Sequence, residues 1–322
     1  MDNYCLRYRS FGPPAKRLGL ERDESRDTSN QFLRVEMSLA PINPSDLIPI
    51  TGAYAHRIKL PAVAGYEGEG RIVDAPRTHT DLIGQRVLPL RGRGTWQCFV
   101  DCDPALAISV PNNIDDTTAA RSYINPLAAI RMLEKWPVLD KRVLLTRAGS
   151  TCANLLGLWA RQQGATEVIG VYRSPGRAQA LRELGIKPLR LDDKSAIEHV
   201  AKDIDITFDA LGGPIATSIL ESMKNNRVFV GYGLLTGWPL APVIRPRACY
   251  HRFHLRDELQ TLTAQQWQQH FHAIWPRLLE TDLPCVRIFP LTEWREAIDY
   301  FETPGNEKPM LDFTRQNNAC LI

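Results

Sequence analysis

The sequence predicts an α/β protein that combines a β-rich domain with a doubly wound parallel sheet. Two observations lead to this fold class. Residues 1–116 carry short β-type runs set among many prolines and glycines, with almost no helical periodicity. From residue 117 onward, apolar strand-like runs alternate with amphipathic stretches of roughly ten residues, which is the pattern of consecutive βαβ units.

The β-rich part begins the chain. Its strand-like runs are FLRVEMSLA, GRIVDA, RVLPL, CFVDC and LAISV. Because turn residues separate runs of this length, we expect a twisted, barrel-like domain with loops. Residues 16–30 are polar and charged, and they predict an exposed hairpin or loop.

The second part starts with residues 117–136, whose apolar side chains recur at helical spacing. The strands VLLTR, VIGVYRS, ITFDALG and RVFVGYG follow, separated by helical stretches. Since these strands are mostly apolar, both faces of their sheet should be covered. Two more helical stretches and a final strand close the chain, so we place the domains at 1–116 with 285–322 and at 117–284.

Composition excludes several classes of protein. The 322 residues are 44% hydrophobic and 23% charged, as in ordinary globular domains. A net charge of +3 gives no sign of the concentrated basic stripe that nucleic-acid binding requires. No apolar run approaches the roughly 20 residues of a membrane span. The first residues, MDNYCLRYRS, lack the apolar core of a signal peptide, so we expect a cytoplasmic protein without nucleic-acid or membrane partners.

The stretch VLLTRAGSTCANLLG, residues 143–157, predicts a strand, a tight turn and a helix. The start of such a helix presents free N–H groups and a partial positive charge, which bind phosphate. The glycine pattern of the turn is incomplete, so plain packing is the alternative to nucleotide binding. The candidate cofactor-binding residues of this turn are Gly149, Ser150, Thr151 and Cys152.

The second strand of this part ends in basic and hydroxyl side chains. These are Tyr172, Arg173 and Ser174, with Arg177 close behind. An acidic residue in this place would hold the ribose hydroxyls of NADH, whereas arginine suits the 2′-phosphate of NADPH. The pattern favours NADPH; the alternative is that the arginines are ordinary solvated charges.

A third element of the same kind is the strand RVFV followed by Gly231, Tyr232 and Gly233. Glycines at the carboxyl end of a central strand allow a flat ring to approach the backbone, and ligands lie at that edge of a parallel sheet. The alternative is a turn that needs positive φ angles.

These residues support a family resemblance. The stretches APINPSDL, TGAY, LPAVAGYEGEGRIV, GQRVLPL, GTWQCFV, INPLAAIRML, DALGG and VFVGYGLLTG occur in the order and spacing of one superfamily. The chain resembles the zinc-independent medium-chain dehydrogenases/reductases, in the quinone oxidoreductase and 2-enoyl thioester reductase branch. The resemblance implies a GroES-like catalytic domain joined to a Rossmann cofactor domain, and homodimers that pair through the cofactor-domain sheet, here near VFVGYGLL and PLAPVI.

The residues argue against a metal site. Zinc members of the superfamily carry a cysteine and a histidine where this chain has Asn43 and Tyr66. The four-cysteine lobe of those members is missing. The seven cysteines are scattered without a CxxC pair, which also argues against a zinc ribbon or a disulfide framework.

The resemblance implies hydride transfer from NADPH to the β-carbon of an alkene conjugated to a carbonyl. Tyr54, in ITGAYAHR, matches the tyrosine that assists protonation in enoyl thioester reductases; the alternative is a packing tyrosine. Asn43 and Trp96 match neighbouring positions of the cleft and are further catalytic candidates. Asn43 alternatively only pins the backbone, and Trp96 alternatively only lines the wall of the site.

Three further residues of the cofactor domain are open to two interpretations. Asn125 matches a position near the nicotinamide, or it is a helix N-cap that precedes Pro126. Asn154 replaces a glycine that is common in this branch. Arg147, just before the turn, either contacts a phosphate or blocks the pocket. The last two departures weaken or abolish cofactor binding if the turn no longer fits.

The sequence therefore predicts an NADPH-dependent reductase of α,β-unsaturated carbonyl compounds, with 2-enoyl thioesters of CoA or of a carrier protein as substrates. The basic residues Arg57 and Lys59, which follow Tyr54, suit such a thioester; solvated surface is the alternative. A quinone or enone reductase is the alternative within the fold. From another class, the chain could be a non-catalytic nucleotide-binding or regulatory protein whose cofactor loop has degenerated.

Overall fold

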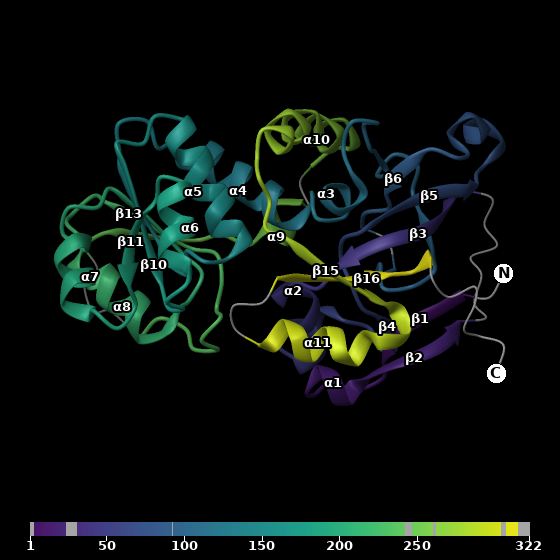
Figure 1. Cartoon of the computed structure of the whole chain (residues 1–322), viewed down its shortest axis with the longest axis horizontal. Helices are drawn as coiled ribbons and strands as arrows, with labels where there is room; N and C mark the ends of the chain where they lie inside the picture. The colour runs from purple at the N-terminus through teal and green to yellow at the C-terminus, as the bar shows by residue number, and fades with distance from the viewer. Residues whose placement is uncertain are drawn as a thin grey trace. The chain divides into compact units, whose positions relative to one another are not determined.

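The computed structural model describes residues 3–23, 31–91, 93–241, 247–259, 262–303 and 307–314. The chain divides into two compact units (Figure 1): unit 1 is Met1–Ile124 with Leu262–Ile322, and unit 2 is Asn125–Thr261. Unit 1 is rich in strands and unit 2 alternates strands with helices, so the predicted fold class is confirmed. Within the described ranges, no helix has both the length and the apolar character needed to cross a bilayer.

Unit 1 contains two sheets. The smaller has the order β2–β1–β4, and the larger follows the path β15–β16–β3–β5–β6–β8, with β7 also paired to β3. The strands are β1 (Asn3–Tyr8), β2 (Leu18–Asp23), β3 (Leu33–Pro41), β4 (Ala62–Val63), β5 (Glu69–Asp74), β6 (Arg86–Leu88), β7 (Phe99–Cys102), β8 (Ile108–Ser109), β15 (Val286–Pro290) and β16 (Lys308–Asp312). The α-helices are α1 (Pro14–Arg17), α2 (Pro44–Leu47), α3 (Asp116–Ala120), α10 (Ala264–Leu279) and α11 (Trp294–Glu302).

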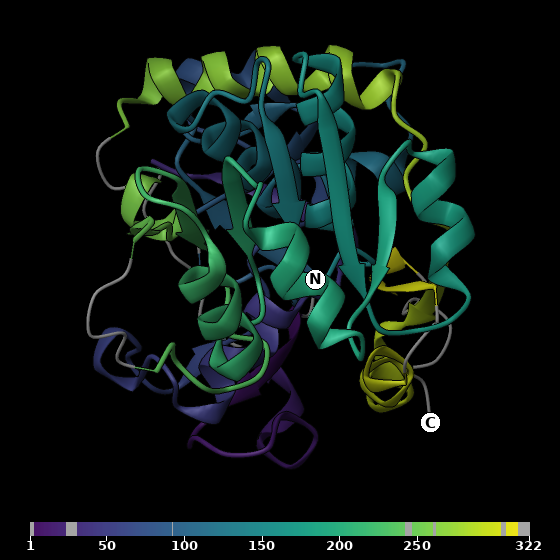
Figure 2. The same ribbon diagram turned by 90° about the vertical axis from the view of Figure 1, so that its left-hand side faces the viewer.

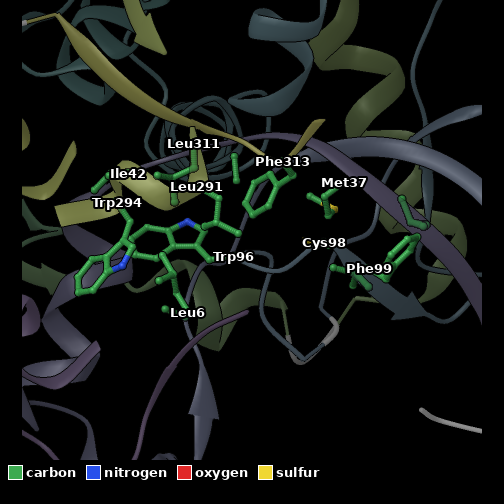
Figure 3. Close-up of a cluster of buried hydrophobic side chains, with 14 of the residues drawn as sticks. Leu6, Met37, Ile42, Trp96, Cys98, Phe99, Leu291, Trp294, Leu311 and Phe313 are labelled. Atoms are coloured by element: carbon green, nitrogen blue, oxygen red, sulfur yellow. The ribbon is translucent and has the colours of Figure 1, made fainter. Parts of the chain in front are cut away.

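The core of unit 1 follows from the alternation of side chains along its strands. In β3, Leu33, Val35 and Met37 are buried, while Glu36 between them is exposed, as a period of two residues requires. Figure 3 shows the resulting cluster, in which Trp96 and Trp294 lie among aliphatic side chains. Both indoles are at most 1% exposed, so they anchor this core.

Unit 2 is built on a six-stranded sheet in which every pairing is parallel. Its order, β11–β10–β9–β12–β13–β14, is the 3-2-1-4-5-6 order of a Rossmann domain. The strands are β9 (Arg142–Leu145), β10 (Glu167–Tyr172), β11 (Lys187–Arg190), β12 (Ile206–Asp209), β13 (Val228–Gly231) and β14 (Cys249–Arg252). The helices are α4 (Ile124–Lys135), α5 (Thr151–Gln162), α6 (Arg177–Glu183), α7 (Lys194–Ala201), α8 (Gly213–Ser222) and α9 (Leu255–Leu259).

Helices cover both faces of this sheet. Neighbouring residues of each strand point to opposite faces, so the apolar side chains of the strands pack against helices on both sides. Leu144 of β9 packs in a cluster with residues of α7 and α8. The next residue, Leu145, lies instead against Gly157 of α5 and Ile186, since a Cβ added to Gly157 would meet both side chains. Figure 2 looks onto this unit and shows helices packed against the strands. A doubly wound sheet results, as predicted.

The structure divides the chain at 124/125 and 261/262, whereas the sequence analysis placed the boundaries at 116/117 and 284/285. The difference consists of α3 and α10. Helix α10 groups with unit 1 because Trp267 donates its indole N–H to the carbonyl oxygen of Leu106 over 2.9 Å and packs edge-on against Tyr123. Its amphipathic sequence shows that it needs an apolar partner but not which unit supplies it.

Two local expectations need correction. Residues 18–23 of the expected hairpin or loop 16–30 form β2, which pairs with β1 along its whole length; residues 24–30 lie outside the described residues. The helical pattern of 117–136 is divided into α3 and α4, because Arg121–Tyr123 leave the helical path between them.

Candidate functional site

The turn between β9 and α5 has the expected architecture. Ala148 donates its backbone N–H to Val171 of the neighbouring strand β10 over 2.9 Å, which holds the turn at the sheet edge. Ser150 is the N-cap of α5, and its hydroxyl accepts a hydrogen bond from the backbone N–H of Ala153 at 3.3 Å. Thr151 and Cys152 are the first two residues of the helix. Their N–H groups have no intrahelical acceptor, which is the property that phosphate binding uses.

Asn154 closes the turn where the glycine pattern is incomplete. Its side-chain amide donates to the carbonyl oxygen of Ala148, so the first turn of α5 is tied back to the end of β9. A glycine could not make this bond. The departure from the common pattern therefore leaves a turn that is held by a hydrogen bond in place of close helix packing.

The basic residues that follow β10 lie next to this turn. The carbonyl oxygen of Ser174 accepts the N–H of Arg177 at the start of α6. The side chain of Arg177 lies over Gly149, since a Cβ added to this glycine would be 3.3 Å from Cγ of the arginine. Tyr172 is the last residue of β10, and its carbonyl oxygen accepts the N–H of Leu191. The structure thus brings the predicted residues of β9, β10 and α6 together at one edge of the sheet.

Tyr232 reaches the same turn from β13. Its hydroxyl is buried beside the side chains of Ser150 and Cys152, and burial raises its pKa well above the usual value. Burial also raises the pKa of the Cys152 thiol to about 12, so this cysteine is a neutral packing group. Its sulfur lies 3.9 Å from the carbonyl oxygen of Asn125. The candidate residues Asn125, Ser150, Cys152 and Tyr232 are therefore neighbours.

The two glycines that flank Tyr232 do not have positive φ, so that alternative is wrong for them; in the same stretch only Gly237, with φ +77°, serves such a turn. A Cβ added to Gly233 would lie 2.7 Å from the carbonyl oxygen of Ala210, and one added to Gly231 would lie 3.2 Å from the Tyr250 ring. Close packing against this chain accounts for both positions. Whether a cofactor ring also uses them stays a prediction.

Thr146 and Asp209 form a polar pair that the sequence analysis did not single out. The Thr146 hydroxyl donates to Asp209 over 2.6 Å, and the carboxylate accepts the backbone N–H groups of Leu211 and Gly212. Both side chains are at most 1% exposed, and burial raises the pKa of Asp209. The pair fixes the carboxyl ends of β9 and β12. The sequence signal was a polar residue at the end of each of two apolar strands.

In unit 1, Asn43 lies inside a buried polar network. Its side-chain N–H donates to Glu67 over 2.7 Å, and its amide oxygen accepts from the ammonium of Lys308. Its backbone N–H donates to Asp46 over 2.7 Å at the start of α2. With 1% exposure, Asn43 holds its surroundings in place, which supports the interpretation that it pins the backbone.

Trp96 is a core residue. It is fully buried, and its indole N–H donates to the carbonyl oxygen of Pro41 at 3.3 Å. The ring packs directly on Gly65, where an added Cβ would lie 2.3 Å from the indole and φ is +88°. This glycine of the AGYEGEG motif therefore makes room for the tryptophan. The contacts are those of a packing residue.

Tyr54 is placed differently. It is partly exposed in the turn that precedes the short 3-10 helix Ala55–Arg57. Gly52, two residues earlier, packs against Phe11, because a Cβ atom added to this glycine would lie 3.2 Å from Cβ of Phe11. Among the three catalytic candidates, Tyr54 has the accessibility that contact with a substrate requires, whereas Asn43 and Trp96 are enclosed.

The prediction that Asn125 caps a helix is wrong. Helix α4 begins at Ile124, so Asn125 lies inside its first turn together with Pro126. The cap is supplied by Glu67, whose carboxylate accepts the backbone N–H groups of Ile124 at 2.7 Å and Tyr123 at 3.2 Å. A partner this distant in the sequence leaves no local signal. Among the described residues, no three or more histidine, cysteine, aspartate or glutamate side chains gather as a metal site.

Known proteins are similar to this chain in sequence and in fold. No family model matches the chain. The mitochondrial enoyl-[acyl-carrier-protein] reductase of Mus musculus is 37% identical over 249 residues, which span 73% of this chain and 67% of the relative. The crystal structure of a putative NADPH:quinone reductase from Bacillus thuringiensis is 30% identical, with a TM-score of 0.90 over 97% of this chain and 99% of that one. The Etr1p complex with NADP and crotonyl-CoA, at 18% identity and a TM-score of 0.81, shares the fold over 97% of this chain and all of that one.

Proposed function

Since this chain belongs to the zinc-independent medium-chain dehydrogenase/reductase superfamily, in its quinone reductase and 2-enoyl thioester reductase branch, we propose that it is an NADPH-dependent reductase of 2-enoyl thioesters. The observation that carries the proposal is the cofactor turn. It departs from the common glycine pattern, yet Asn154 keeps it closed and Ser150 caps the helix behind it. The chain is an oxidoreductase rather than a non-catalytic protein that has kept only the fold.

The residues at the carboxyl edge of the unit 2 sheet fit NADPH. When bound, the cofactor supplies the hydride. The start of α5, at Ser150 and Thr151, would hold its pyrophosphate through backbone N–H groups. Arg173 and Arg177 would hold the 2′-phosphate through charged hydrogen bonds. The Thr146–Asp209 pair joins the carboxyl ends of β9 and β12, next to the turn that begins α5.

Tyr54 is proposed as the residue that touches the substrate. Its neutral hydroxyl would donate a hydrogen bond to the carbonyl oxygen, on which negative charge develops during reduction, and would assist delivery of a proton to the α-carbon. Partial exposure supports this role. Asn43 and Trp96 would act from behind the site, Asn43 by fixing α2 and Trp96 by filling the core.

The thioester is proposed over a free enone because exposed basic residues follow Tyr54. Arg57 and Lys59 are both exposed. They suit the phosphates of CoA or of the phosphopantetheine on a carrier protein. A quinone or small enone is the second candidate, supported by the likeness to the bacterial quinone reductase structure.

The experiment follows NADPH oxidation by absorbance with crotonyl-CoA and, separately, with a simple quinone. We expect the wild type to reduce crotonyl-CoA, and Tyr54→Phe to be slower by about 10²-fold or more, as loss of acid catalysis predicts. Tyr4→Phe on β1 is the matched control and should retain the rate. Turnover of the quinone alone, unchanged in Tyr54→Phe, would instead favour the second candidate. Failure to reduce either compound, with no change of tryptophan fluorescence on adding NADPH, would leave a non-catalytic protein.

We also propose that the chain forms homodimers through β14. This strand ends the order of the unit 2 sheet, and its four residues are all exposed. A strand at a sheet edge presents unpaired backbone groups that a second copy can pair with. The sequence analysis placed this edge near VFVGYGLL and PLAPVI; β13 is an inner strand, and part of the second stretch lies outside the described residues.

A further inference from the structure

Three arginines meet at the carboxyl edge of the unit 2 sheet. Arg147 follows β9, in the turn that leads to α5. The backbone hydrogen bond from Ala148 to Val171 holds this turn next to the end of β10, and Arg173 follows that strand. Arg177 begins α6 and lies over Gly149, two residues after Arg147. Burial and the positive charges of Arg173 and Arg177 lower the pKa of Arg147, in keeping with three guanidinium groups in one place.

None of these three side chains has a hydrogen bond or ion pair with any residue that the structure describes. Other arginines of the same unit are paired. Arg142 binds Glu167 over 2.7 Å, and Arg190 binds Asp192. Arg147 and Arg173 are exposed and Arg177 is partly exposed, so water screens their mutual repulsion, and all three guanidinium groups are accessible to an anion that would pair with them.

Arg147 also adopts a backbone conformation that is costly for its residue type. Its φ of +53° lies in the left-handed region, which glycine adopts without steric cost and which residues with a Cβ atom adopt less readily. Strain of this kind persists where the surroundings need the side chain. The exposed guanidinium makes no hydrogen bond or ion pair within the described chain, so it is available to a ligand.

We propose that Arg147 completes a three-arginine site for a phosphate monoester, the 2′-phosphate of NADPH, and thereby makes this chain selective for the phosphorylated cofactor. The inference rests on the proposed function and extends it to a residue outside the common motif. A guanidinium group binds phosphate oxygens through two parallel hydrogen bonds, and the charge of a phosphate dianion can be shared by several guanidinium groups. NADH has no phosphate monoester for the cluster to bind, so the cluster adds affinity for NADPH alone.

The 2′-phosphate suits the cluster better than the pyrophosphate does. The pyrophosphate is held at the helix start by backbone N–H groups. The ribose of the adenosine lies at the end of the second strand, which is where Arg173 stands. Arg147 and Arg177 approach this place from the turn and from α6, so the cluster surrounds the position of the phosphate monoester.

The test uses Arg147→Gly, because glycine keeps the positive φ without strain and should leave thermal stability equal or higher. Affinities of wild type and variant are measured by titration calorimetry for NADPH, NADH, 2′,5′-ADP and 5′-AMP. We expect NADPH and 2′,5′-ADP to bind about tenfold or more weakly to the variant, as loss of a charged hydrogen bond predicts. NADH and 5′-AMP should bind unchanged or more tightly. Arg182→Ala, which removes an exposed charge from α6, is the matched control and should alter neither affinity.

Equal affinity of the wild type and Arg147→Gly for 2′,5′-ADP would overturn the inference, and so would tighter binding of NADPH to the variant, which would mean that Arg147 blocks the pocket. An equal loss for 5′-AMP and 2′,5′-ADP would also overturn it, because the contact would then be to a different phosphate. The reductase proposal is judged separately. If the wild type binds 2′,5′-ADP through Arg147 but reduces no enoyl thioester, the anion site stands and the proposed function fails.

Discussion

Glu69 shows how one side chain can make the stability of this fold depend on pH. The carboxyl group is 1% exposed on β5. Arg86 is 3.8 Å away but lies closer to Asp116, at 2.6 Å. Burial, and next the negative charge of Asp116, raise the pKa of Glu69 from 4.5 to about 7. A pKa raised by folding means that the folded state favours the protonated form. The contribution to stability is therefore complete below about pH 4.5 and is lost as the pH rises through about 7.

We expect Glu69→Gln to remove this dependence, because the amide stays neutral at every pH. The free energies of unfolding of variant and wild type should be similar near pH 5. Near pH 8 the variant should be the more stable by roughly 1–3 kcal/mol, since one pKa unit is worth about 1.4 kcal/mol. Urea unfolding at both pH values measures the difference. Glu36→Gln, at an exposed position of β3, is the control, and an equal effect of Glu69→Gln at the two pH values would contradict the prediction.

At the scale of single residues, the sequence predicts chemical types but not their partners. Arg173 and Arg177 could be read from the sequence because they follow a recognisable strand. The role of Glu67 could not, since it caps α4 from 57 residues away in the chain. The burial of Trp96 could not be predicted either, because the residue type alone does not show whether an indole is buried in the core or lines a site. Its packing on Gly65 appears only in three dimensions.

The start of α4 and the start of α2 are joined by the polar network around Lys308. Its ammonium on β16 binds Asn43, while Glu67 and Asp46 lie near enough to favour the charged form. Burial opposes charge on all three groups: it lowers the pKa of Lys308 and raises the pKa values of Glu67 and Asp46. The elements therefore depend on one cation that compensates two buried acids.

We expect Lys308→Met to lower the free energy of unfolding by about 3 kcal/mol or more, because it leaves two buried carboxyl groups without their cation. The double variant Lys308→Met/Glu67→Gln should recover part of this loss, since the amide needs no counter-charge. Denaturant unfolding of both proteins measures the difference. Lys224→Met, which removes an exposed pair with Asp203, is the control and should cost less than about 1 kcal/mol. A double variant no more stable than Lys308→Met would count against the network.

At the scale of elements, the sequence predicts the inner strands better than the outer ones. Strands β9, β10, β12 and β13 were visible because both of their faces are covered and their residues are apolar. Strand β14 has four exposed residues, and β11 has no fully buried residue, so neither carries that pattern. Strand β1 was missed because its sequence, NYCLRY, has no regular alternation of polar and apolar residues, although it pairs with β2 along its whole length.

At the scale of the whole molecule, the order of the strand-rich and helix-containing segments along the chain predicts the two-unit organisation. A β-rich start, alternating strands and helices, and a return to the first unit are all seen in the structure. The placement of α10 could not be derived from its own sequence. It depends on hydrogen bonds from Trp267 and Gln268 to carbonyl oxygens near β8, which an amphipathic pattern does not specify.

Assembly is the remaining property at this scale. A dimer that pairs β14 with β14 of a second copy around a two-fold axis would bring each Tyr250, 45% exposed, close to its own equivalent. We expect the wild type to sediment as a dimer at micromolar concentration. Tyr250→Asp should sediment as a monomer, because two carboxylates would then face each other across the axis and the charged edge resists pairing. Leu139→Asp, at a position 63% exposed between α4 and β9, is the control and should remain dimeric. A monomeric wild type would refute the dimer, and a dimeric Tyr250→Asp would move the interface away from β14.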